Sequence, residues 1–492
     1  MKNYFKIFLV SFVGIGFCTG LFSQSSSTHD GLSTAKLMGG MAQANITPPI
    51  GSRLAGHFFE SISTGIHDSL WAKAMVLQQG KEKFVFVFCD LIGMTPQVSS
   101  TARLMAFKKT GIPVRNIVIA ATHSHTGPLF YGFQHDYFHT KAMAAGIDPH
   151  EKIDYSGFLI KQIVKAIVGA NNHRVPVSLE TGIGEQERLS HNRRYYMKNG
   201  EVLFNPGPLN PEIVRPAGPI DPAVGILMIR NVKSWKLLGG LTVFAMHADS
   251  FGGTQISADY PFYIEQTLKQ EFGTNFISAF GLGPCGDINH IDVTKDEPIY
   301  SPANPRRFGT MLGQTVIDAV PNLKQVINPR MAILSAKILL PLEVPAESQI
   351  DSARTIINKL YEAGDSGEYT KRAGGESGDF IKRVRMSKYI NLAARKKNVE
   401  VEVQVYRLDS ETAMVALPGE IFAALGLAIK KSSPFKNTLV ITVCNDKTSY
   451  VPTRKAFTEG SYEVTNAVIK PGAGEMLVET SVKLLNKIKR VR

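Results

Sequence analysis

Short apolar runs alternate with polar, glycine-containing or proline-containing segments along most of this chain. Apolar runs bounded by turn-forming residues are typical of strands whose two faces are both buried. The predicted strands are Phe84–Phe88, Asn116–Ala120, Gly225–Arg230, Leu241–Met246, Val401–Tyr406, Met414–Leu417 and Leu439–Val443.

Other segments repeat their apolar positions with the period of a helix. In Tyr155–Ala170 the apolar residues recur three or four positions apart, as on one face of a helix. Strands and helices do not alternate strictly, so we expect an α/β (mixed α+β) domain built on a mixed sheet. Further helices are predicted at Tyr263–Phe272, Asp351–Ala363, Ile421–Lys431 and Gly474–Lys489, and irregular loops at Asn205–Gly218, Tyr300–Arg307 and Ala363–Gly378.

Candidate metal ligands follow four of the predicted strands: His123 and His125, then His247, Glu420 and Tyr450. Imidazole is the commonest metal ligand, and two histidines with one glutamate form a known catalytic zinc set that leaves a position open. On an extended segment, the first two histidines would face the same side. The alternative is that they are loop histidines satisfied by the neighbouring threonine and serine. We expect strand-end loops to assemble a zinc site.

The chain also carries a series of short motifs: Ala44–Gly51, Gly65–Asp68, Ala121–Pro128, Asn192–Arg193, His247–Ser250, Gly286–Asp287, Pro418–Glu420 and Tyr450–Thr453. Together and in this order they resemble the neutral (non-lysosomal) ceramidases, over roughly Ala44 to Gly474. The resemblance implies a ceramidase-like catalytic domain that binds Zn²⁺. It implies His123, His247, Glu420 and Tyr450 as zinc ligands, and His125, Arg193 and Tyr462 as substrate-facing polar groups.

Two departures from that family bear on the chemistry. The family reads Gly-Asp-Val-Ser-Pro-Asn where this chain reads Gly286–Ile291, so Asn289 stands in place of the serine. An amide side chain makes hydrogen bonds but is no nucleophile. Asp287 is expected either to orient a zinc-bound histidine or water, or to be an ordinary turn residue. The sequence after Tyr462 leaves no room for the further β-sandwich domain that ceramidases carry.

Charge and composition bear on the substrate. The 492 residues include 55 Lys and Arg against 42 Asp and Glu, a formal net charge of +13. The basic residues are scattered and no nucleic-acid motif is present, so a nucleic-acid partner is not expected. An anionic small molecule or oligosaccharide outside the cell is one interpretation of the charge, and plain solubility is the other.

The N-terminus predicts a signal peptide over residues 1–24, followed by one catalytic domain over 25–492. Its apolar core, Ile7–Phe17, is too short for a membrane-spanning helix, so we expect a secreted or periplasmic protein without stable membrane insertion. Cys18 raises the possibility of a lipoprotein, which Phe17 disfavours as the preceding residue. The other three cysteines are an odd number at wide spacing and predict no disulfide framework.

Three functions fit these features. The main hypothesis is a zinc-dependent elimination or dehydration of an acidic, uronate-containing oligosaccharide. Zn²⁺ and Arg193 would neutralise the substrate carboxylate, and His125 and Tyr462 would move protons. The alternative is a zinc amidohydrolase of the ceramidase type that cleaves an N-acyl amide. A third hypothesis is a non-catalytic, zinc-stabilised binding protein with a closed four-ligand site.

Overall fold

The computed structural model describes residues 36–491 except 363–377, 394, 396 and 447. The predicted signal peptide and almost all of the predicted loop Ala363–Gly378 therefore lie outside the described residues. Within the described part, no helix combines the length and the apolar character that crossing a membrane requires.

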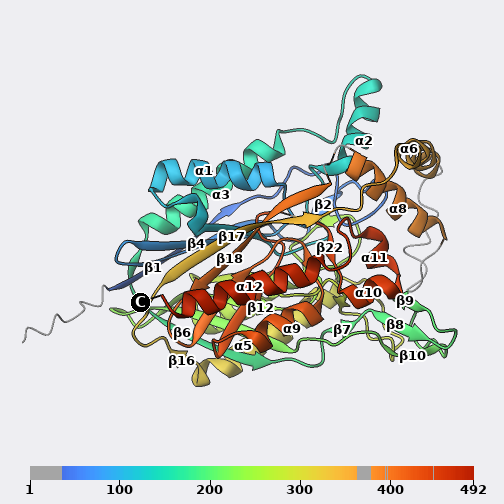
Figure 1. Ribbon diagram of the computed structural model, residues 1–492. Helices are drawn as coiled ribbons and strands as arrows, with labels where there is room; N and C mark the ends of the chain where they lie inside the picture. Colours follow the sequence, from blue (N-terminus) through green and yellow to red (C-terminus); the bar gives the residue numbers. More distant parts are fainter. Residues whose placement is uncertain (1–35, 363–377, 394, 396, 447, 492) are drawn as a thin grey trace, which may run out of the picture. The chain divides into compact units, whose positions relative to one another are not determined.

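A large mixed sheet of nine strands organises the first two thirds of the chain (Figure 1). Its strands follow the order β14-β12-β11-β6-β1-β3-β4-β5, and β16 pairs with β6. The pairs β4–β5 and β12–β14 are parallel, and the remaining neighbours are antiparallel. The strands are β1 (Leu37–Asn45), β3 (Trp71–Gln79), β4 (Glu82–Cys89), β5 (Ile117–Ala121), β6 (Val175–Glu185), β11 (Ala223–Asn231), β12 (Leu237–Phe244), β14 (Ile277–Leu282) and β16 (Lys324–Gln325).

A second sheet packs against one face of the first. It runs β17-β18-β19-β21, and its last pair is parallel. Apolar side chains of both sheets share one core; the ring of Phe86, for example, lies 4.6 Å from that of Tyr406. The strands are β17 (Ala332–Pro341), β18 (Asn398–Arg407), β19 (Thr412–Ala416) and β21 (Asn437–Ile441).

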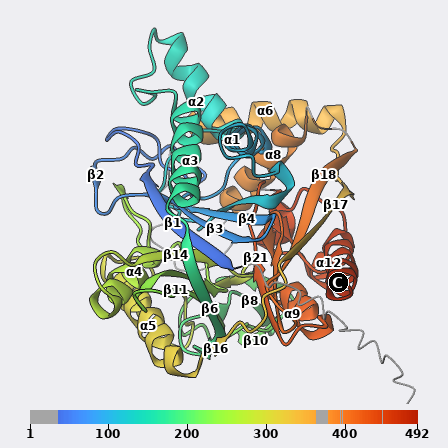
Figure 2. The ribbon, with the colours of Figure 1, turned by 90° about the vertical axis from the view of Figure 1, so that its left-hand side faces the viewer.

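Helices cover the outer faces of both sheets, which gives four layers (Figures 1 and 2). α1 (Pro96–Thr110), α3 (Tyr155–Asn172), α4 (Tyr260–Phe272) and α5 (Ala303–Ala319) share a core with the large sheet. α9 (Ala423–Ser432) and α12 (Ala473–Lys489) cover the small sheet. α3 shows why such segments fold: seven of its residues, among them Leu159, Ile163 and Ile167, are buried on one face, and the Asp154 side chain accepts a hydrogen bond from Gly157 N at its start.

The remaining elements are short or lie at the ends of the sheets. α2 (Gly132–Ala144), α6 (Glu347–Glu362) and α8 (Gly378–Ala393) pack together through a small aromatic cluster. The others are α10 (Arg454–Glu459), α11 (Tyr462–Asn466), the 3₁₀ turns η1 (Val114–Asn116) and η2 (Val320–Asn322), and the strands β2 (Gly65–Ile66), β7 (His191–Asn192), β8 (Arg194–Met197), β9 (Val202–Phe204), β10 (Ile213–Pro216), β13 (Gln255–Ile256), β15 (Ile288–Asn289), β20 (Glu420–Ile421) and β22 (Tyr450–Val451).

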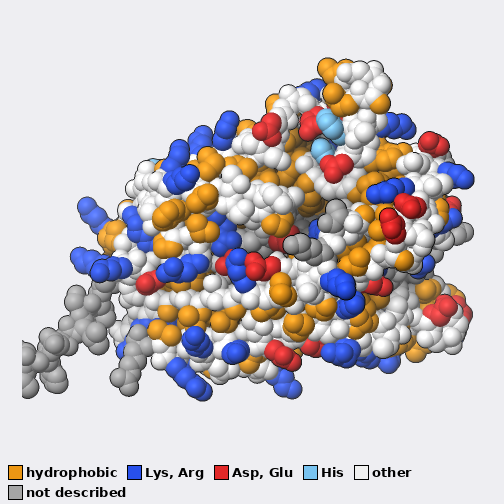
Figure 3. All heavy atoms as spheres, turned by 45° about the horizontal axis from the view of Figure 1, so that its top comes forward, with side chains coloured by type: hydrophobic (Ala, Val, Ile, Leu, Met, Phe, Trp, Pro, Cys, Tyr) orange, Lys and Arg blue, Asp and Glu red, His pale blue; other side chains and the backbone are white. Residues whose placement is uncertain are grey.

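The structure confirms the mixed α/β class, and each predicted strand and helix overlaps an observed one. The predicted loop Tyr300–Arg307 is wrong beyond Pro302, because α5 begins at Ala303. The loop Asn205–Gly218 contains the edge strand β10, which its prolines obscured. α1 escaped prediction because its buried face holds small and polar residues such as Ser99, Ala102 and Arg103. Lysines and arginines are spread over the face in Figure 3 rather than gathered in one patch, as the sequence suggested.

Candidate functional site

The loops that follow parallel strands meet at one place between the two sheets. His123 and His125 follow β5, His247 follows β12, and Glu420 lies in β20, just after β19. Direct contacts join these strand ends: Ala120 of β5 forms a β-bridge with Cys444, and Thr442 N donates to Leu282 O of β14 over 2.8 Å. Glu420 itself pairs with Tyr450 in the short parallel ladder β20–β22.

The three histidines form a compact group, in which His123 and His247 are buried and His125 is partly exposed. The ring centroid of His123 lies 4.9 Å from that of His125 and 4.7 Å from that of His247. The Nε2 atoms of His123 and His247 each lie 3.3 Å from the same oxygen, Glu420 Oε2. Side chains from three distant parts of the chain therefore lie together: the His123–His125 pair, His247 and Glu420.

The hydrogen bonds of His123 and His247 select the imidazole tautomer that can bind a metal through Nε2. His123 Nδ1 lies 2.7 Å from the carbonyl of Ile92, and His247 Nδ1 lies 2.9 Å from the carbonyls of Cys285 and Ile288. A carbonyl only accepts, so each Nδ1 carries a proton, and Nε2 is the ring atom that faces Glu420 and could bind a metal. Burial, followed by the charge of Arg193, lowers the pKa of His247 and keeps it neutral. The donor set therefore fits a divalent metal ion such as zinc, and His123, His125 and His247 group closely enough to hold one.

Backbone geometry brings the histidines together in a way the sequence did not indicate. The expectation that His123 and His125 face the same side of an extended strand is wrong in its reason, because His123 has φ 70°, in the left-handed region. This sparsely populated conformation is held by the hydrogen bond from His123 N to Leu91 O. Close approach also matters at Gly286, where a Cβ atom would lie 2.3 Å from the carbonyl oxygen of Glu420.

Tyr450 and Tyr462 form an aromatic wall beside the histidines. The Tyr450 ring lies 6.4 Å from that of His247 and 5.5 Å from that of Tyr462. Burial, and after it the charge of Glu420, raises the pKa of Tyr450 well above its usual range. A bound cation would act in the opposite direction and favour the phenolate that a tyrosine ligand requires. The wall continues through an apolar cluster: Val384, Ala467, Phe58, Phe204, Phe380, Ile381 and Phe457.

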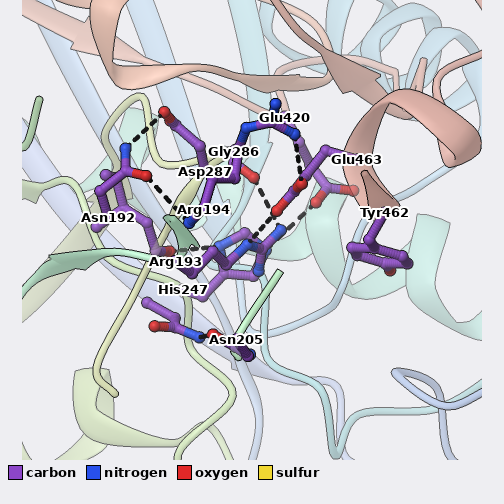
Figure 4. Close-up of polar contacts among 12 residues, drawn as sticks. Asn192, Arg193, Arg194, Asn205, His247, Gly286, Asp287, Glu420, Tyr462 and Glu463 are labelled. Atoms are coloured by element: carbon purple, nitrogen blue, oxygen red, sulfur yellow. Dashed lines mark hydrogen bonds and ion pairs between the residues drawn. The ribbon is translucent and has the colours of Figure 1, made fainter. Parts of the chain in front are cut away.

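Arg193 is buried, and its guanidinium already holds a carboxylate of this chain (Figure 4). Its Nε donates to Glu463 Oε1 and its Nη2 to the carbonyl of Gly286, each over 2.8 Å. Arg194 donates to the other Glu463 oxygen over 3.1 Å. The prediction that Arg193 takes a substrate carboxylate as a bidentate partner therefore meets a competitor in Glu463. Sequence reasoning missed this residue, although it directly follows Tyr462.

Asp287 anchors the start of helix α9 and a neighbouring asparagine. Its two oxygens accept from Ala423 N, 2.8 Å, and from Asn192 Nδ2, 2.9 Å (Figure 4). A carboxylate at the first residue of a helix satisfies a backbone donor that the helix leaves open. These contacts agree with the alternative in which Asp287 is a turn and cap residue.

The buried Asp287 predicts a pH dependence of stability. Burial raises its pKa from 3.8 to about 6. Since the folded chain then holds this proton more tightly than the unfolded chain, the stabilising contribution is full at low pH and is lost as the pH rises through about 6. Between about pH 4 and pH 7, the free energy of unfolding should fall by up to about 3 kcal/mol relative to an Asp287→Asn variant. Urea titrations of both proteins would measure this, and parallel pH profiles would contradict it.

Asn289 lies buried in β15, close to these groups. Its Nδ2 donates to Asn205 Oδ1, and its Oδ1 accepts from Ile291 N, each over 3.1 Å. Both ends of the amide are thus engaged, one with a side chain and one with the backbone. Neither partner is a general base that could activate the amide as a nucleophile.

Asp249 and His290 form a further pair beside the candidate site. The sequence indicated this pair only weakly. Asp249 lines a cavity together with His57, His125 and Tyr300. Its Oδ1 lies 3.2 Å from Nδ1 of the buried His290, and the hydrogen bond and charge of this histidine help to hold the pKa of Asp249 well below its usual range. The fold, and not the sequence, shows that the carboxylate of Asp249 lines the same cavity as His125.

The model of the neutral/alkaline non-lysosomal ceramidase family, N-terminal region, matches residues 38–291, just over half of the chain. The chain belongs to this family. The matched region contains His123, His125, His247, Asp287 and Asn289, and it ends before Glu420.

Similarity to individual ceramidases agrees with this assignment. The neutral ceramidase of Pseudomonas aeruginosa is 26% identical over 240 residues, which are 47% of this chain and 33% of that protein. The aligned region thus spans about a third of that curated relative. Two solved structures share the fold: the neutral ceramidase from Pseudomonas aeruginosa, with a TM-score of 0.66, and a ceramidase complexed with C2, with 0.67. Each is 17% identical, and the match covers 92% of this chain and 75% of theirs. These findings favour the ceramidase-type hydrolase over the oligosaccharide lyase, which receives no support from them.

Proposed function

We propose that the chain is a zinc-dependent amidohydrolase that cleaves an N-acyl amide of the ceramide type. The observation that carries the proposal is the approach of His123 Nε2 and His247 Nε2 to one oxygen of Glu420, each at 3.3 Å, within a ceramidase-family chain. Membership of the family supplies the reaction class, and the donor set supplies the means to perform it.

Four residues would hold the ion: His123, His247, Glu420 and Tyr450. Zinc bound there would polarise an amide carbonyl and lower the pKa of a water molecule. The carbonyls of Ile92, Cys285 and Ile288 hold the imidazoles in the ligating tautomer. His125, whose ring lies 4.9 Å from that of His123, is the group we assign to hold and return the proton that the departing amine needs.

The surroundings suit an apolar substrate better than an acidic one. Phe58, Phe204 and Phe380 pack with Tyr450 and Tyr462 in one cluster next to the proposed ligands. Such a wall excludes water and accommodates an acyl chain. A uronate would need a free guanidinium, whereas Arg193 already binds Glu463. We therefore propose that Arg193 and Tyr462 support the aromatic wall. The guanidinium carbon of Arg193 lies 5.8 Å from the centroid of the Tyr462 ring, in a cation–π contact.

The test is incubation of the zinc-loaded protein with a short-chain ceramide and, separately, with uronate-containing oligosaccharides. Release of free fatty acid and of the amine, measured by mass spectrometry, is expected with the first substrate. New ultraviolet absorbance from carbon–carbon double bonds in the second sample, without amide cleavage, would instead establish the elimination hypothesis. Zinc binding without turnover of either substrate would favour the non-catalytic binding protein.

Asn289 is expected to be dispensable as a nucleophile. An Asn289→Ala variant should keep measurable turnover, with a loss of about thirtyfold or less from the two hydrogen bonds that position the loop, since each contributes about 1 kcal/mol. Asn205→Ala is the matched control, because it removes the hydrogen bond of Asn289 Nδ2 and leaves Asn289 itself in place. A covalent adduct on Asn289, trapped with substrate and found by intact-protein mass spectrometry, would contradict this assignment.

A further inference from the structure

A second group of metal-binding side chains lies on α2 and the loop that follows it, separate from the candidate centre. His135 and His139 are one helical turn apart on α2. Their rings are stacked, with centroids 5.8 Å apart and planes only 5° from parallel. Residues four positions apart lie on the same face of a helix, so both imidazoles face one side of α2, which projects from the layers in Figures 1 and 2.

Two carboxylates from the following loop meet these imidazoles. Glu151 spans both rings: its Oε2 lies 2.5 Å from His139 Nδ1 and its Oε1 lies 3.6 Å from His135 Nε2. Asp148 Oδ2 lies 2.9 Å from His139 Nδ1. Ligand atoms of His139, Asp148 and Glu151 all lie within 4.8 Å of one another. Figure 3 shows histidine side chains beside acidic ones on this accessible part of the molecule.

One of the two carboxylates is held in place before any ion arrives. Asp148 is buried, and its oxygens accept from His150 N over 2.9 Å and from Arg53 Nη1 over 2.6 Å. These two hydrogen bonds fix the orientation of its side chain. Asp136 adds a third negative charge, 3.0 Å from His135 Nδ1. In a chain of net charge +13, this is a local surplus of acidic groups around two imidazoles.

We infer that His139, Asp148 and Glu151 bind a divalent transition metal of the zinc type, with His135 as the neighbouring imidazole that contacts Glu151 and helps to orient it. Imidazole nitrogens with carboxylate oxygens suit Zn²⁺ and its neighbours, whereas Ca²⁺ and Mg²⁺ prefer oxygen ligands alone. The inference does not depend on the proposed function, because none of its residues belongs to the candidate centre.

Such an ion would fasten α2 to the loop of residues 148–151. Through Arg53 and Asp148 that loop is tied to the segment containing Gly56, whose φ is 96°. A Cβ atom on Gly56 would lie 2.5 Å from the carbonyl oxygen of His125, so this segment packs directly against the candidate centre. The metal site on α2 would therefore stabilise the Gly56 segment next to His125 without taking part in the reaction.

The test is the number of zinc ions that the full chain retains in equilibrium dialysis at micromolar free Zn²⁺. Two equivalents are expected for the unchanged protein, and one for His135→Ala/His139→Ala and for Glu151→Gln. His150→Ala is the matched control, since it removes a neighbouring imidazole whose Nδ1 contacts the carbonyl of Gly51, and it should retain two.

A variant of the other site separates the two proposals. His123→Ala should still retain the ion on α2, which is one equivalent. If the unchanged protein and His123→Ala each retain one equivalent and the α2 variants retain none, the α2 site is supported and the candidate centre is not a zinc site. Equal zinc content in the unchanged protein and in both α2 variants would overturn the inference. That result would leave the cluster as a set of histidine–carboxylate contacts that binds no metal.

Discussion

Replacing His247 by alanine is expected to abolish zinc binding at the candidate centre and to lower kcat/KM by about a thousandfold. The metal supplies several kcal/mol of transition-state stabilisation, and each 1.4 kcal/mol corresponds to a factor of ten. His123→Ala should have the same effect, because both Nε2 atoms lie 3.3 Å from Glu420 Oε2. Elemental analysis of the purified variants and ceramide turnover measure the two losses together.

Both histidines are buried, so their replacement also needs a control for folding. His173→Ala is a suitable one, since this histidine is exposed at the C-terminal end of α3. His247→Gln keeps a polar side chain that can still donate to the carbonyls of Cys285 and Ile288. Near-ultraviolet circular dichroism should be unchanged in the glutamine variant while zinc and activity are lost. Full retention of the candidate-centre zinc in the His123 and His247 variants would contradict the assignment of the ligands.

Replacing Arg193 by alanine is expected to destabilise the protein by about 3–5 kcal/mol. Arg193 and Glu463 have side-chain exposures of 2% and 0%, so removing the cation leaves a buried carboxylate with one of its two arginine partners. The carbonyl of Gly286 would lose its donor in the same change. The midpoint and slope of urea unfolding measure the effect.

A solvent-exposed ion pair gives the matched comparison. Lys337 and Glu400 have side-chain exposures of 66% and 55%, and Lys337→Ala should cost less than about 1 kcal/mol. Arg193→Lys should fall between the two, because an ammonium group lacks the planar fork that reaches Glu463 and Gly286 together. Equal losses for the buried and the exposed pair would disprove the structural role of Arg193.

The pattern of apolar residues alone determined the fold class and the positions of several strands, among them β4, β11 and β12, but not of β6, β1 and β3 at the centre of the large sheet. Phe84–Phe88 and Met414–Leu417 are apolar on both faces, which is stable only where a strand is covered on each side. It did not determine β17, because this strand has alternately exposed residues and less continuous apolar character. The identity of the candidate ligands came from motifs whose order resembles a family, and their convergence became visible at the ends of parallel strands.

Only the tertiary structure decided the partners of charged and polar residues. Arg193 and Glu463 both lie in polar segments, and nothing in their separation along the chain indicates that they meet. Asp287 likewise had two readings until its contacts with Ala423 N and Asn192 were known. Burial is periodic in sequence because strands and helices are periodic. Pairing between distant side chains depends on how the sheets pack, and that information is distributed over the whole chain.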